Sequence, residues 1–167
     1  MGLVYVFTGK GGGKTTNALG MALRSLGHGH KVVVIQFLKW YQETGEFKFK
    51  HENYEIYQCG KPGWKSRSEL GDEDKVLQRS GIHIFNSFML RGDTDLIVLD
   101  ELNLAMSMGM IDVDIVLRIL DNIPERTTIV ITGREAPKEI IKIADLVNEI
   151  SPVKSPEVEP CDKGIQY

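Results

Sequence analysis

Short apolar runs alternate along the chain with longer amphipathic stretches. Four of these runs, rich in β-branched residues, predict buried strands at Leu3–Phe7, Lys31–Phe37, Leu96–Glu101 and Thr127–Thr132. After the first run, apolar residues recur at helical spacing from Ala18 to Leu26, and Gly27 and Gly29 are placed to end a helix. This order of strand, helix and strand predicts parallel strands joined by right-handed crossovers. The pattern therefore indicates an α/β fold whose mostly parallel sheet is flanked by helices.

The periodicity elsewhere predicts further elements. Helices are expected at Asp72–Leu90, Asp112–Leu120 and Pro137–Val147. The first of these has an apolar face made of Val76, Leu77, Ile84, Phe85 and Phe88, and Gly92 is placed to end it. Alternating apolar and polar residues predict short strands at Phe47–Lys50 and Tyr54–Tyr57. The tail from Pro152 to Tyr167 has no clear periodicity.

Length and composition limit the classes of protein that need to be considered. With 167 residues the chain has the length of one domain, and we expect residues 1–167 to share one core. A hydrophobic content of 42% and a charged content of 26% are typical of a soluble globular protein. The net charge of −3 argues against a general nucleic-acid binder, and no apolar run approaches the roughly 20 residues that span a membrane. Cys59 and Cys161 lack metal-ligand spacing and are expected to be reduced thiols, which is consistent with the cytoplasm.

A glycine-rich loop lies between the first predicted strand and the first predicted helix. Its candidate phosphate-binding residues are Thr8, Gly9, Lys10, Gly11, Gly12, Gly13, Lys14, Thr15 and Thr16. Glycines let backbone N–H groups surround phosphate oxygens in conformations that a side chain would obstruct. Lys14 adds a positive charge, and Thr15 offers a hydroxyl to Mg²⁺. Only three residues separate Gly9 from Gly13, one fewer than in the usual motif, so the orientation of the nucleotide stays open.

Other polar side chains come at the ends of further predicted strands. Asp100 and Glu101 end the third long run, and an acid at this place in a nucleotide site binds Mg²⁺ directly or through water. Arg134 follows the last predicted strand, where it could contact a phosphate oxygen or form a salt bridge to Glu101 or Glu135. Gln36 lies at the end of the second strand. Because ligands of open α/β sheets bind at the carboxyl ends of strands, these residues are expected at the same edge as the glycine loop.

Several stretches together resemble one family with a P-loop NTPase-like, RecA-like fold. They are Thr8–Thr16, Val34–Lys39, Val98–Leu102, Ile131–Arg134 and Lys163–Tyr167. In these stretches, including the short glycine loop, the chain is similar to the ATP:corrinoid adenosyltransferases of cobalamin assembly and salvage. The resemblance implies that cobalt(I) of a reduced corrinoid attacks C5′ of ATP and expels triphosphate, with Mg²⁺ or Mn²⁺ as the metal. It also implies that the nucleotide lies reversed in the loop relative to ordinary ATPases.

The resemblance assigns roles to residues that match the motifs of the family. It implies catalytic roles for Lys14, Thr15 and Arg134, and metal binding by Thr15, Asp100 and Glu101. It implies that Gln36, Lys39 and Trp64 help to bind the nucleotide or the corrinoid. Trp64 matches a tryptophan in a loop whose aromatic residues replace the lower axial ligand of cobalt. Pro62 stands where relatives have a phenylalanine, and Phe47, Phe49 or Tyr57 could substitute for it.

The family also implies partners and a region that faces the corrinoid. Residues 38–70 are expected to form that region. An electron-donor flavoprotein would reduce the corrinoid, and the family suggests a cytoplasmic homodimer with no nucleic-acid or membrane partner. Many relatives carry an N-terminal segment that covers the nucleotide. Since this sequence begins at the first predicted strand, the cover is expected to come from elsewhere or to be reduced.

Two other classes of function are kept as alternatives. The stretch from Lys10 to Thr16 is also similar to the loop of signature-lysine ATPase switches, which has one residue more. ATP hydrolysis that rises on dimerisation or with a partner, without corrinoid binding, would favour that class. A non-catalytic carrier of a corrinoid or a nucleotide would instead bind tightly without turnover.

Overall fold

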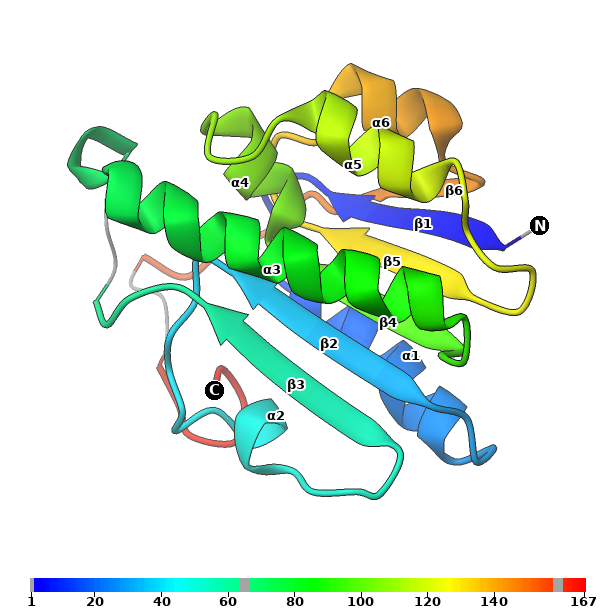
Figure 1. Cartoon of the computed structure of the whole chain (residues 1–167). Helices are drawn as coiled ribbons and strands as arrows, with labels where there is room; N and C mark the ends of the chain where they lie inside the picture. Colours follow the sequence, from blue (N-terminus) through cyan, green and yellow to red (C-terminus); the bar gives the residue numbers. More distant parts are fainter. Residues whose placement is uncertain (1, 64–66, 158–160) are drawn as a thin grey trace.

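The computed structural model describes residues 2–63, 67–157 and 161–167, and its centre is one parallel sheet (Figure 1). In the described residues the sheet has six strands in the order β3-β2-β4-β5-β1-β6, and all neighbouring pairs are parallel. The strands are β1 Leu3–Thr8, β2 Val32–Phe37, β3 Tyr54–Cys59, β4 Leu96–Asp100, β5 Thr128–Thr132 and β6 Leu146–Glu149. The predicted α/β fold with a parallel, P-loop NTPase-like sheet is therefore confirmed.

Helices cover both faces of this sheet. The helices are α1 Lys14–Leu26, α2 Gly45–Lys48, α3 Asp72–Arg91, α4 Leu102–Ser107, α5 Val113–Leu120 and α6 Lys138–Ile143, with a short 3₁₀ turn at Arg67–Glu69. Helix α1 lies on one face, whereas α3, α4, α5 and α6 lie on the other (Figure 1). None of the helices in the described ranges is long and apolar enough to cross a membrane.

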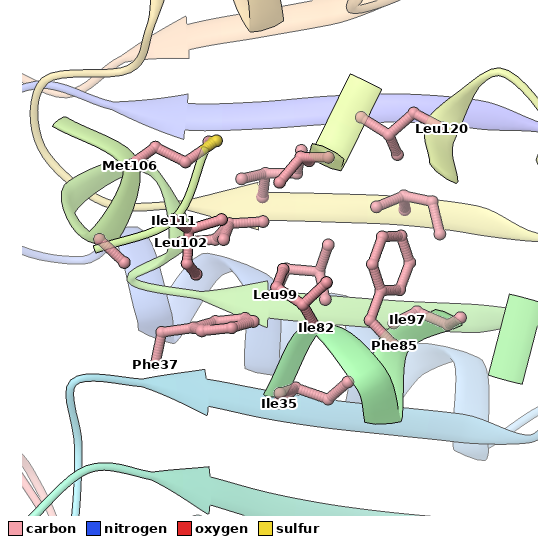
Figure 2. Close-up of a cluster of buried hydrophobic side chains, with 14 of the residues drawn as sticks. Ile35, Phe37, Ile82, Phe85, Ile97, Leu99, Leu102, Met106, Ile111 and Leu120 are labelled. Carbon is pink, nitrogen blue, oxygen red and sulfur yellow. The ribbon is translucent and has the colours of Figure 1, made fainter. Parts of the chain in front are cut away.

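Burial on both faces explains why the strands read as continuous apolar runs. Along β2, Val33, Ile35 and Phe37 join the core under α3, while the alternate residues Val32 and Val34 pack on the side of α1. Figure 2 shows the larger of the two clusters, where side chains from the strands meet those of α3, α4 and α5. Because the neighbouring strands are all parallel, their carboxyl ends lie at the same edge of the sheet, which brings the residues at those ends together.

Two predicted elements are wrong. Residues 47–50 were expected to form a strand, but the chain forms α2 at Gly45–Lys48 instead. The helix expected from Pro137 to Val147 ends at Ile143, because Asp145 binds the backbone of β1: its N–H donates to Val4 O (2.9 Å), and its Oδ2 accepts from Val4 N (2.8 Å). The following residues then pair with β1 as β6. Strand β3 is confirmed and extends to Cys59.

The long helix α3 is confirmed, but its core-facing side differs from the prediction. Val76, expected on the apolar face, is 61% exposed. The buried side includes Gln78 and Gly81, and a Cβ at Gly81 would lie 2.7 Å from the Phe37 ring and 3.0 Å from Cys59 Sγ. The helix therefore approaches β2 and β3 closely where those strands end.

Candidate functional site

The carboxyl ends of the central strands carry unusual backbone conformations. Leu38, Glu101 and Glu135 have φ values of 59°, 60° and 57°, and they are the only non-glycine residues with positive φ in the described part of the chain. Each follows a strand directly or within three residues, namely β2, β4 and β5. Such conformations cost energy and persist where the surrounding structure enforces them, often at functional sites. This edge of the sheet is therefore the candidate site.

The glycine loop is held in a defined shape at this edge. Gly9 and Gly13 have φ values of 97° and 95°, and a Cβ on Gly9 would lie 2.4 Å from Ile150 O. Gly11 N donates to the same Ile150 oxygen (2.7 Å). Lys14 Nζ donates to Gly11 O (2.6 Å), and burial is the main cause that lowers the pKa of Lys14 below its ordinary value. The loop is thus closed around its own lysine and braced by the residue after β6.

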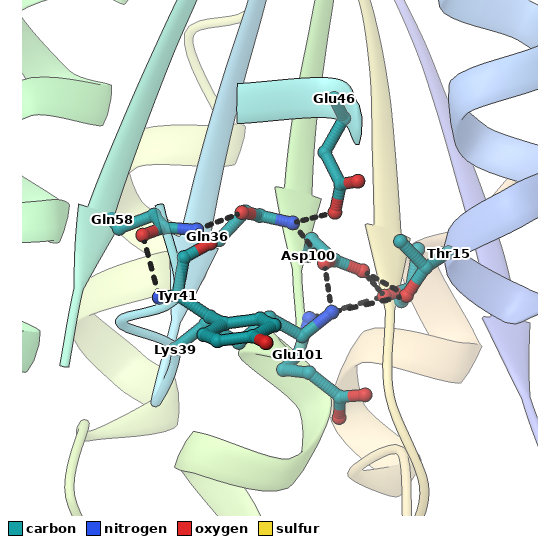
Figure 3. A network of polar contacts seen from close by, with 9 residues as sticks. Thr15, Gln36, Lys39, Tyr41, Glu46, Gln58, Asp100 and Glu101 are labelled. Carbon is teal, nitrogen blue, oxygen red and sulfur yellow. Dashed lines mark hydrogen bonds and ion pairs between the residues drawn. The ribbon is translucent and has the colours of Figure 1, made fainter. Parts of the chain in front are cut away.

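Asp100 is the centre of the hydrogen-bond network at the site (Figure 3). It is fully buried at the end of β4. Its Oδ1 accepts from Thr15 Oγ1 (2.8 Å) and Thr132 Oγ1 (2.6 Å), and its Oδ2 accepts from Lys39 Nζ (2.7 Å) and Gln36 Nε2 (3.0 Å). Burial alone would raise the pKa of Asp100, but the ion pair with Lys39 and the hydroxyl donors outweigh it and hold the pKa below the ordinary value. Asp100 is therefore kept ionised.

A second layer of polar groups holds Gln36 in place. Besides Asp100, its Nε2 donates to Glu46 Oε1 on α2 (3.1 Å), and its Oε1 accepts from Gln58 Nε2 on β3 (2.9 Å). Gln58 Oε1 in turn accepts from Tyr41 N (2.8 Å). Figure 3 shows this chain of contacts running from Asp100 toward the segment after β2. Gln36 thus orients Asp100, while both the nitrogen and the oxygen of its own side-chain amide form hydrogen bonds.

Glu101 differs from Asp100 in having a carboxylate oxygen without a partner. Its backbone N–H donates to Thr132 Oγ1 (3.1 Å), but no group in the described residues donates to its buried Oε2. Burial is the main cause that raises the pKa of Glu101, and neighbouring Asp100 adds to it. A buried carboxylate oxygen without a partner is costly unless a cation or donor completes it. The Thr15 hydroxyl and the carboxylates of Asp100 and Glu101 are hard oxygen donors of the kind that Mg²⁺ prefers.

A cavity of about 480 Å³ opens beside this acid pair. Its lining combines apolar and charged side chains, among them Leu38, Lys39, Lys61, Leu70, Glu101, Leu104, Met108, Arg134 and Glu135. Arg134 is exposed there, and within the described ranges it forms no ion pair with Glu101 or Glu135. The salt bridge considered for Arg134 is therefore not formed, and its guanidinium is available to a ligand.

The structure brings most of the predicted site residues to one edge. The glycine loop, Gln36, Lys39, Asp100, Glu101 and Arg134 all lie at the carboxyl ends of the strands. The Thr8 hydroxyl accepts from Ala136 N (3.3 Å) and so braces the loop after β5, while Lys10 and Thr16 are exposed. Trp64 lies outside the described residues.

Sequence reasoning missed other residues that build the site. Thr132 contacts both acids, and its place at a strand end could have revealed it. Glu46, Gln58 and Gln78 carry no motif, and the contact of Ile150 with the loop depends on the unpredicted β6. These residues are recognisable only from the folded chain.

Comparison with known proteins agrees with the geometry. The sequence model of the family described as ATP:corrinoid adenosyltransferase BtuR/CobO/CobP matches residues 1–167. The chain is 33% identical over 153 residues to the corrinoid adenosyltransferase of Escherichia coli K12, covering 92% of this chain and 78% of that protein. It is 35% identical over 156 residues to that of Pseudomonas aeruginosa (92% and 76%), and 33% identical over 157 residues to corrinoid adenosyltransferase CobA of Salmonella typhimurium (92% and 78%).

Proposed function

Because the chain belongs to the ATP:corrinoid adenosyltransferase family, we propose that it transfers the 5′-deoxyadenosyl group of ATP to cobalt(I) of a corrinoid and releases triphosphate. The match over the whole chain carries this proposal. The site supports it, since a phosphate-binding loop, a pair of acids and a cavity adjoin one another. The ATPase switch named above has no comparable support from the relatives.

This reaction needs little acid or base catalysis from the protein. Cobalt(I) is itself the nucleophile, a cobalt–carbon bond forms at C5′, and the C5′–O bond breaks with its electron pair leaving on triphosphate. The protein must orient C5′ toward the metal centre of the corrinoid and stabilise the charge on the leaving group. Lys14, the N–H groups of the glycine loop and Arg134 are the groups we assign to the triphosphate. Mg²⁺ held by Thr15, Asp100 and Glu101 would supply further neutralisation of that charge.

The surroundings of Lys14 and Arg134 suit these assignments. Within the part of the chain that the structure describes, the hydrogen bond of Lys14 Nζ goes to the carbonyl of Gly11, and phosphate oxygens can replace this contact. Arg134 projects from the same edge on the cavity side, with no ion pair among the described residues to compete for it. A planar guanidinium suits a phosphate oxygen because it donates two parallel hydrogen bonds.

We assign the corrinoid to the cavity on the side of residues 38–70. Its lining includes residues of that region, namely Leu38, Lys39, Gly60, Lys61 and Leu70, together with Glu101 of the acid pair. A ligand seated there would face the nucleotide across the edge of the sheet. By resemblance, Trp64 would replace the lower axial ligand of cobalt, and an electron-donor flavoprotein would supply the reducing electron.

The oligomeric state and the cellular compartment of the enzyme can also be proposed. By resemblance, we propose that it acts as a homodimer. The cytoplasm is the compartment that supplies ATP, and it would keep the free thiols of Cys59 and Cys161 reduced.

The test is anaerobic mixing of the protein with Mg-ATP and chemically reduced cob(I)alamin. We expect the absorbance of a light-sensitive cobalt–carbon product together with one equivalent of triphosphate. Lys14→Ala should lower the transfer rate at saturating ATP by about 100-fold or more, because the leaving charge loses a buried cation. Orthophosphate without an alkylated corrinoid would identify an ATPase instead, and near-normal transfer by Lys14→Ala would contradict the role of that lysine.

A further inference from the structure

Lys39 occupies an unexpected place in the metal site. Its Nζ lies 2.7 Å from Asp100 Oδ2 and 3.3 Å from Thr15 Oγ1, so the ammonium contacts two of the three residues assigned to the metal (Figure 3). The ammonium therefore stands between oxygen donors where a divalent cation would have to enter.

The backbone next to Lys39 is strained, and two contacts hold it in place. Leu38 has a left-handed φ of 59°, which turns the chain sharply after β2. Its N–H donates to Gln78 Oε1 (3.0 Å), and Gln78 Nε2 donates to Cys59 O (2.6 Å), which ties the ends of β2 and β3 to α3. Gly60 packs so closely that a Cβ there would lie 2.7 Å from backbone atoms of Leu38 and Lys39. A strained conformation that Gln78 and Gly60 both hold in place indicates that the direction of Lys39 matters.

The side chain of Lys39 is freer than its backbone. It is 31% exposed, whereas that of Asp100 is 1% exposed, and Lys39 also lines the cavity beside the acid pair. Its long stem can thus carry the ammonium out of the acid pair without any backbone movement. Asp100 cannot follow, because Thr15, Thr132 and Gln36 also hold it.

We propose that Lys39 is a stand-in cation that fills the metal position of the nucleotide-free enzyme and leaves it when Mg-ATP arrives. A buried carboxylate such as Asp100 requires a counter-charge, which Lys39 supplies until the divalent ion does. The displaced ammonium remains within the cavity and brings its charge to the phosphate chain. The metal therefore enters with the nucleotide and not before it. This inference rests on the proposed Mg-ATP site but not on the identity of the acceptor.

The test measures metal binding by nucleotide-free protein, with Mn²⁺ as the probe and free Mn²⁺ counted by electron paramagnetic resonance. We expect Lys39→Met to bind Mn²⁺ at least about tenfold more tightly than the wild type, because no buried ion pair has to break first. Adding ATP should tighten Mn²⁺ binding much less in this variant than in the wild type. Lys31→Met is the matched control. Lys31 also forms an ion pair with an aspartate, Asp93 (2.8 Å), but it precedes β2 and so lies at the opposite end of that strand from Lys39. Its Mn²⁺ affinity should equal that of the wild type.

Further variants separate this role from a structural one. Adding Asp100→Asn to Lys39→Met should abolish the gained Mn²⁺ site, which would identify the site as the acid pair. A folded Lys39→Met protein, with a cooperative thermal transition, that binds Mn²⁺ within twofold of the wild type would overturn the proposal. Lys39→Gln serves in its place if Lys39→Met does not fold. Wild-type protein whose Mn²⁺ affinity is unchanged by ATP would also overturn it. None of these readings uses a corrinoid, so failure of the transferase assay would be distinguishable.

Discussion

Replacing Thr132 by valine tests whether one hydroxyl holds both acids of the site. Thr132 is fully buried at the end of β5. Its Oγ1 donates to Asp100 Oδ1 at 2.6 Å and accepts from Glu101 N at 3.1 Å. Valine has nearly the same shape, so Thr132→Val removes these two hydrogen bonds and leaves little cavity. Thr132→Ser is the matched control, because it keeps the hydroxyl and removes only a methyl group.

The expected loss follows from the kinds of hydrogen bond removed. A hydrogen bond to an ionised carboxylate contributes about 1.5 to 3 kcal/mol, and one between neutral groups contributes about 0.5 to 1.5 kcal/mol. Thr132→Val should therefore lower the free energy of unfolding by about 2 to 4 kcal/mol. Thr132→Ser should cost about 1 kcal/mol, the value of one buried methyl group.

Urea unfolding of the two variants and the wild type measures the difference. With a slope of about 2 kcal/mol per molar urea, the midpoint for Thr132→Val should fall by about 1 to 2 M. Thr132→Val should also weaken the binding of Mg-ATP, since Asp100 and Glu101 lose their shared support. If Thr132→Val were as stable as Thr132→Ser within about 0.5 kcal/mol, the hydroxyl would not be holding the acid pair.

Two further predictions concern the stability of the fold. Gly81→Ala should lower the melting temperature, because the added Cβ would lie 2.7 Å from the Phe37 ring. Such overpacking costs about 1 to 3 kcal/mol, which exceeds the roughly 1 kcal/mol that alanine gains over glycine in helix propensity. Gly20→Ala on α1 should raise the melting temperature, because a Cβ there meets no atom within 4 Å. Equal shifts of the melting temperature in the two variants would contradict the packing argument. At Asp95, burial alone would raise the pKa, but the Lys31 N–H and Arg126 hold it below its ordinary value. Asp95 therefore stabilises the fold above the unfolded pKa of about 3.9, and that stabilisation is lost as pH falls through the folded pKa. In urea unfolding, Asp95→Asn should therefore have a lower free energy of unfolding than the wild type, and this difference should be largest near neutral pH and shrink in acid. A difference that does not change with pH would refute this.

The order of strands and helices was predictable because burial on both faces of the sheet leaves a plain signal. Short runs rich in β-branched residues, such as Val32–Phe37, are typical of strands that are buried on both faces. The end of α6 left no such signal, since its apolar residues continue at helical spacing into what becomes β6. The outcome there is decided by the contact of Asp145 with Val4, which lies 141 residues away in the sequence. Tertiary pairing overrode the local pattern.

The site was predictable where a motif names its residues and not where geometry alone selects them. The glycine loop, Asp100 and Arg134 stand in recognisable stretches at strand ends. The direction of Lys39 depends on a left-handed Leu38 and on Gln78, a polar residue on the core side of α3. Neither residue carries a sequence signal for that role, because leucine seldom adopts positive φ and glutamine is usually exposed.

The bracing of the glycine loop by Ile150 makes the nucleotide motif depend on a segment remote from it. Gly9 and Gly11 both contact the carbonyl of Ile150, which extends the pairing of β6 with β1. Since β6 is an exposed edge strand with one neighbour, it is also the strand most open to fraying. The motif is thus not an autonomous module. A fragment of the chain ending before residue 146 would keep the whole sequence of the loop but lose the contact with Ile150 that holds its shape. In evolutionary terms, substitutions in β6 are expected to change the shape of a loop that lies some 140 residues upstream.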